Sequence, residues 1–78
     1  MSRYYFNVRN SVVLDDPEGV DCSDQAAARN YALAQARVLA AEDVQEGRLD
    51  LKHRIEVADE DRTPLFVVTF RDAIAINF

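Results

Sequence analysis

The stretch DQAAARNYALAQARVLAAEDVQE, residues 24–46, decides the fold, because it is the one segment long and regular enough to predict a helix by itself. Alanine, leucine, arginine and glutamine are strong helix formers, and neither glycine nor proline interrupts the stretch. Ser23 or Asp24 can cap its start, and Gly47 suits the left-handed position just past its last turn. We therefore expect one long helix with strands on either side.

The apolar residues of this helix fall on two faces. One face is expected to pack closely on a sheet, because its residues are mostly small. It comprises Ala28, Ala32, Ala36 and Leu39, and we expect Tyr4, Phe6 and Val8 opposite it. A second line has the 4-3-4-3 spacing of two helices packed side by side, which predicts a two-fold homodimer with antiparallel or crossed helices. Its residues are Ala27, Tyr31, Ala34, Val38 and Ala41.

Alternation of polar and apolar residues predicts strands before and after the helix. The expected strands are residues 3–9, 12–14, 52–58 and 64–70, with a short extended piece at 20–22. Residues 72–78 fit either a short helical turn or an edge strand. The order is β-β-α-β-β, and the expected fold class is a two-layer α+β domain with one long helix packed on an antiparallel sheet. An uncovered sheet edge, with 66–70 or 74–78 as the joining strand, is the alternative route to a dimer.

Length, charge and cysteine content limit the classes of protein. The 78 residues are expected to form one domain, 1–78, and the net charge of −5 disfavours non-specific binding to nucleic acid. No apolar run reaches about 18 residues and the start does not read as a signal peptide, so we expect a cytoplasmic protein without a membrane span. The single cysteine, Cys22, cannot form an internal disulfide and is interpreted as structural.

Motifs spread over nearly the whole chain carry a resemblance. They are RYYF at 3–6, DPEG at 16–19, the alanine-rich helix, an acidic turn at 59–61, and Phe70 followed by Asp72-Ala73. Together they resemble a bacterial family of small domains of unknown function, which implies a fold and no reaction. Arg62 departs from the pattern because a turn glycine is frequent there, and Tyr31 and Val38 stand where charged residues are usual. A more distant similarity, of architecture only, is to HicB-type antitoxins.

Residues able to carry out chemistry are few. The only histidine, His53, lies on an expected strand beside apolar residues, where a part-buried structural role is the interpretation. One cysteine and one histidine cannot supply the four ligands of a zinc site without carboxylates or a second chain. The acids of residues 15–24 lack the spacing of a calcium loop and are interpreted as solvated turn residues. We therefore predict no catalytic residue, no metal, no cofactor and no enzymatic activity.

Basic and aromatic side chains on the outer face of the expected sheet form a candidate nucleic-acid surface. They are Arg3, Tyr5, Arg9, Lys52 and Arg54. Such a face can stack single-stranded RNA, but a polar face on a one-sided sheet is commoner, and the negative charge favours that interpretation. Nucleic acid is thus not the expected partner.

The expected function is that of a small non-enzymatic interaction domain that self-associates through the helix. Its expected partner is a second copy of the chain, with an unidentified protein partner left open. Two alternatives stand beside it: a nucleic-acid-associated module using the outer sheet face, and an antitoxin-like or inhibitor-like binder of a basic protein.

Overall fold

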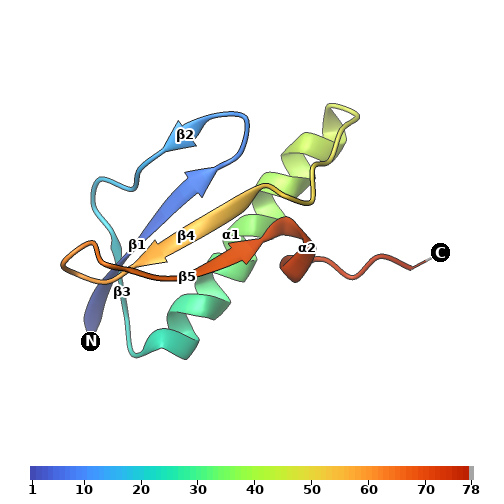
Figure 1. The fold of residues 1–78 in the computed structure, drawn as a ribbon. Helices are drawn as coiled ribbons and strands as arrows, with labels where there is room; N and C mark the ends of the chain where they lie inside the picture. The colour runs from blue at the N-terminus through green and yellow to red at the C-terminus, as the bar shows by residue number, and fades with distance from the viewer. Residues whose placement is uncertain (78) are drawn as a thin grey trace.

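A computed structural model describes residues 1–77, and Figure 1 shows one long helix lying along a sheet. The elements are β1 (Ser2–Arg9), β2 (Val13–Leu14), β3 (Val20–Cys22), α1 (Gln25–Gln45), β4 (Arg54–Ala58), β5 (Pro64–Thr69) and α2 (Phe70–Ala73). Asp24 caps α1 by accepting a hydrogen bond from the N–H of Ala27, and Gly47 just past the helix has a positive φ of 82°. The predicted α+β class and the central helix are confirmed.

The sheet has the order β2-β1-β4-β5, and each pair of neighbours is antiparallel. The edge of β1 that faces away from β4 pairs with β2 near the end of β1 and with β3 near its start. In this register Phe6 lies opposite Val57, and Ile55 lies opposite Val68. Phe6, Ile55, Val57 and Val68 therefore share one face, whereas the other face carries mostly polar residues of β1 and β4 together with Val67 of β5.

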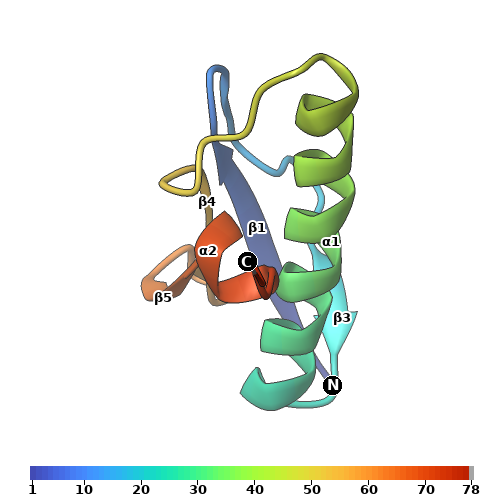
Figure 2. The same ribbon diagram turned by 90° about the vertical axis from the view of Figure 1, so that its right-hand side faces the viewer.

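The core lies between this apolar sheet face and one face of α1, as Figure 2 shows from the side. Ala28, Ala32, Ala36 and Ala40 are almost completely buried, so small side chains let the helix approach the sheet closely. Tyr4 and Phe6 are buried opposite them, as predicted, while Val8 is half-buried. Leu39 is only half-buried, because it lies at the border of the packed face.

The ends of the later strands differ from expectation. Phe70 was expected to close a strand but begins α2, because Thr69 and Asp72 form a capping box. In that box the Thr69 hydroxyl accepts from the N–H of Asp72, and the Asp72 carboxylate accepts from the N–H of Thr69. The expected stretch 72–78 is thus partly helical; residues 74–77 have no regular secondary structure, and Phe78 lies outside the described residues.

His53 lies just before β4 rather than within it, and it is half-buried as expected. Its ring packs edge-on against Phe70, with centroids 5.6 Å apart. Nδ1 lies 3.6 Å from a carboxylate oxygen of Asp43, and Nε2 lies 3.5 Å from one of Asp50. These contacts connect the end of α1 to the segment that leads into β4.

Candidate functional site

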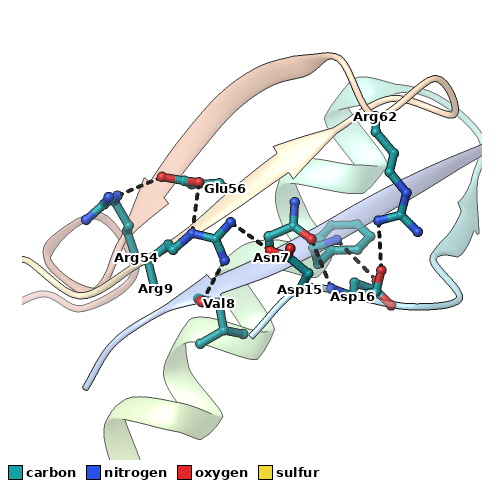
Figure 3. A network of polar contacts seen from close by, with 9 residues as sticks. Asn7, Val8, Arg9, Asp15, Asp16, Arg54, Glu56 and Arg62 are labelled. Atoms are coloured by element: carbon teal, nitrogen blue, oxygen red, sulfur yellow. Dashed lines mark hydrogen bonds and ion pairs between the residues drawn. The ribbon is translucent and has the colours of Figure 1, made fainter. Parts of the chain in front are cut away.

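The loop between β2 and β3 completes the edge of β1. Phe6 lies between the parts of β1 that pair with β3 and with β2, and its N–H donates to Oδ2 of Asp16 at 3.2 Å. The other carboxylate oxygen accepts from the N–H groups of Glu18 and Gly19 at 3.1 and 3.0 Å. Asn7 Oδ1 in turn accepts from the N–H of Asp16 at 2.9 Å (Figure 3). Asp16 is therefore a structural residue, not the solvated turn acid expected.

The pKa of Asp16 lies below its ordinary value. Partial burial acts to raise this pKa, because burial penalises the charged carboxylate. The hydrogen bonds from Gly19, Phe6 and Glu18 and the nearby charge of Arg62 act in the opposite direction and outweigh burial. The loop thus holds Asp16 as an anion.

Two left-handed backbone positions lie beside this loop. Gly19 has φ 74°, and a Cβ there would come within 2.8 Å of the carbonyl oxygen of Tyr4, so the position requires glycine. Arg62 has φ 62° and stands at a position where the family that the sequence resembles often has a turn glycine. Its guanidinium carbon lies 3.8 Å from the ring centroid of Tyr5, and Nη1 donates to the carbonyl of Asp16 at 3.0 Å. These contacts offset the strain of a left-handed arginine.

Arg9 and Arg54, at one end of the β1–β4 pair on the outer sheet face, are paired with carboxylates, as Figure 3 shows. Arg9 Nη2 lies 2.8 Å from Oδ1 of Asp15, and Arg9 Nε lies 3.2 Å from Oε1 of Glu56. Arg54 Nε lies 3.1 Å from the other oxygen of Glu56. Much of the positive charge here is neutralised within the chain.

The residues of the candidate nucleic-acid surface do not make one open patch. Arg9 and Arg54 lie opposite each other in the register, but they share a glutamate. One face of Tyr5 is covered by the turn arginine, so that face cannot stack on a base. Arg3 lies at the far end of β1, 3.3 Å from an aspartate of β3, and Lys52 is exposed before β4. The face is an ion-paired surface with both signs of charge.

The helix line proposed as a dimer seam is only partly exposed. Ala34, Val38 and Ala41 are exposed, whereas Ala27 and Tyr31 are half-buried and pack against the core. The ring centroids of Tyr31 and Phe6 are 4.6 Å apart. The expectation that the whole line would otherwise face water is therefore wrong for Ala27 and Tyr31, since Tyr31 completes the core on that side of the helix.

A groove of about 430 Å³ opens between α1 and the loop side of β1. Its apolar lining includes Phe6, Leu14, Tyr31, Leu39 and Ile55. Close to it, the hairpin after β1 exposes three consecutive apolar residues, Val12, Val13 and Leu14. Sequence reasoning assigned these residues to a strand and missed the groove, although a run of three consecutive apolar residues is a signal of a surface that needs cover.

The strand β5 ends the sheet on its other side, as Figure 2 shows. Its sequence, PLFVVT, carries no charge, and Val67 is 44% exposed. Edge strands usually carry charges, prolines or bulges that block pairing with other chains. Here Pro64 and a bulge near Val57 and Ala58 affect only the start of the strand. Residues 66–68 leave a regular edge, and at Thr69 the N–H is already bonded to Asp72.

Residues suited to metal or thiol chemistry are sparse. Over residues 1–77, no group of three or more histidine, cysteine, aspartate or glutamate side chains could hold a metal ion. Burial raises the pKa of the Cys22 thiol, and the charges of Asp21 and Asp24 raise it further, which favours the unreactive thiol. Among the described helices, none has the length and apolarity needed to cross a membrane.

The fold and these surfaces define a small two-layer α+β domain. Asp16 joins its loop to the sheet, and the exposed features are an apolar hairpin and an open sheet edge. Residues 3–71 match the family model described as Domain of unknown function (DUF6894), and the chain belongs to this family. The resemblance carried by its sequence motifs is thereby confirmed. No curated protein and no solved structure matches the chain significantly.

Proposed function

We propose that the chain is a small, non-enzymatic interaction domain of the cytoplasm that self-associates as a homodimer. The observation that carries this proposal is the outer edge of β5, which is regular over residues 66–68, offers the carbonyl of Thr69 beyond them, and carries no charge. Such an edge presents backbone donors and acceptors to another strand. A chain of this size also buries a limited share of its surface, so a partner adds stability.

The exposed face of α1 is the second candidate surface for self-association. Ala34, Val38 and Ala41 remain exposed there, and Val38 contributes most of the apolar area. Tyr31, the largest residue of the line, already packs on Phe6, which leaves less area for a partner than the spacing predicted. This counts in favour of the strand edge.

Binding to nucleic acid ranks below self-association. The arginines of the outer face are held by carboxylates, and the chain carries a net charge of −5. Phosphate backbones are bound mainly through uncompensated positive charge. The ion pairs therefore support the protein-interaction proposal instead.

Light scattering after size exclusion, from micromolar to millimolar concentration, tests the proposal. We expect the mass to approach twice the chain mass of 8.8 kDa as the concentration rises. Val38→Glu is the variant for the helix surface, because it leaves Tyr31 and the core in place, and we expect it to dimerise like the wild type. A wild type that stays at 8.8 kDa throughout this range contradicts self-association.

A further inference from the structure

We propose that two copies join edge to edge at β5, antiparallel about a two-fold axis at Val67, so that their sheets become one continuous sheet. This inference rests on the proposed self-association and adds the surface, the register and the symmetry. The second copy is the occupant that fits, because an antiparallel edge is complementary to itself under a two-fold axis.

The hydrogen-bond pattern of the sheet shows which groups of β5 point outward. Phe70 N–H donates to the carbonyl of His53 at 2.8 Å, and Val68 lies opposite Ile55 two residues earlier. In an antiparallel pair, alternate residues bond to the neighbouring strand and the residues between them point away. Phe70 and Val68 therefore bond towards β4, and the N–H and carbonyl of Val67 point to the outer edge.

The hydrogen bonds of β1 support the same assignment of inward and outward backbone groups. Phe6 N–H donates to Asp16, away from β4, although Phe6 lies opposite Val57 in the register. Val57 therefore directs its backbone groups to β5, where its partner is Phe66. Two independent contacts thus give the same assignment, with Val67 between two inward-bonding residues.

An axis at Val67 gives a register that follows the outward-pointing groups of β5. Val67 pairs with Val67 of the second copy through two N–H to carbonyl hydrogen bonds, and Leu65 lies opposite Thr69 of that copy. Thr69 N–H already donates to Asp72 at 2.9 Å, so its carbonyl is the group offered to the partner. The valine side chains meet in a β-branched cross-strand pair, which favours the sheet.

Charge favours the antiparallel direction. An acidic turn at residues 59–61 precedes β5, and Arg71 follows it. Antiparallel pairing brings the acidic turn of one copy towards Arg71 of the other, whereas parallel pairing would bring the two acidic turns together. The strand itself contributes no charge to the contact, and the nearest charges on β4, Glu56 opposite Val67 and Arg54 opposite Thr69, are paired with each other at 3.1 Å.

A pair of complementary charges at position 67 tests this inference. Val67→Lys places two like charges together at the axis, and Val67→Glu does the same, so each variant alone should be a monomer where the wild type is a dimer. An equimolar mixture should restore the dimer, because lysine then meets glutamate. Val67→Thr, which keeps a β-branched residue, is the matched control and should dimerise. Circular dichroism reports whether each variant keeps its fold.

The outcomes separate the two proposals. A monomeric wild type overturns both. The β5 register is overturned, and self-association kept, if the wild type is a dimer and the Val67→Lys and Val67→Glu variants are dimers too. A mixture of these two variants that stays monomeric has the same meaning. Loss of the dimer in Val38→Glu would then assign the contact to the helix. If the position 67 variants fail to fold, amide exchange of wild-type Val67 decides. Protection that rises with protein concentration supports the inference, and protection independent of concentration overturns it.

Discussion

At the scale of single residues, Asp16 shows how a surface acid becomes part of the fold. Its carboxylate accepts three backbone N–H bonds, one from a strand and two from its own loop. An isolated strand residue such as Phe6 would otherwise leave its N–H without a strand partner in the gap between β2 and β3. The carboxylate therefore joins the loop to the sheet.

We predict that Asp16→Asn lowers the free energy of unfolding at neutral pH by about 1–3 kcal/mol. An amide can present one oxygen to the loop, but its NH₂ group cannot accept from Phe6 N–H. Asp15→Asn is the control, because Asp15 is exposed and pairs only with a surface arginine; its effect should stay below about 1 kcal/mol. Chemical denaturation of the three proteins gives the comparison.

The difference in unfolding free energy between wild type and Asp16→Asn should depend on pH in a defined direction. The folded-state pKa of Asp16 is lowered, so its contribution is complete above the unfolded carboxyl pKa of about 4 and disappears as pH falls through the folded value. The stability gap between wild type and Asp16→Asn should therefore be constant from neutral pH to about pH 5 and narrow in more acidic buffer. A gap that widens on acidification would contradict the assignment.

The sequence indicated the loop but not the role of its acid. The DPEG motif at 16–19 predicts a turn from Pro17 and Gly19 alone. The gap in β1 that Asp16 fills depends on where two short strands pair, which local periodicity does not encode. The sequence indicated the left-handed backbone of Arg62 more clearly, because the family often has a turn glycine at this position.

At the scale of elements, the helix was the most predictable part of the molecule. Its cap, its end and its buried alanine face follow from propensity and from the 3.6-residue period. The faces of β1 and β4 follow from alternation, whereas β5 is apolar almost throughout, and its face and the order of the strands required the structure. Phe70 was misassigned because its apolar character continues the strand pattern, while the Thr69 to Asp72 capping spacing that ends the strand was in the sequence.

We predict unequal effects for two core substitutions in α1. Ala32→Leu should lower the free energy of unfolding by about 1–3 kcal/mol, because the fully buried alanine faces a packed sheet and leaves no room for a larger side chain. Leu39→Ala should cost no more than about 2 kcal/mol, below the range of a fully buried leucine, since Leu39 is half-buried at the groove. Thermal denaturation of both variants with Ala34→Ser, at an exposed position, gives the ranking; equal melting temperatures would contradict it.

At the scale of the whole molecule, the two faces of the sheet differ in charge: the inner face is apolar, and the outer face carries ion pairs. The inner face packs on α1, and the outer face carries a chain of contacts from Asp15 through Arg9 and Glu56 to Arg54. These contacts lie at the surface and remain partly open to solvent, so each contributes little to stability. Their main effect is on the potential that an approaching phosphate backbone encounters.

We therefore predict that the wild type does not shift single-stranded RNA in a gel at physiological salt. Glu56→Gln removes the carboxylate shared by Arg9 and Arg54 and changes the net charge from −5 to −4, so weak binding should appear only at low salt. The double variant Arg3→Ala with Arg54→Ala is the control, and it should bind no better than wild type under any condition. Micromolar affinity of the wild type, with a salt dependence that this double variant flattens, would place nucleic acid above self-association as the function of the outer face.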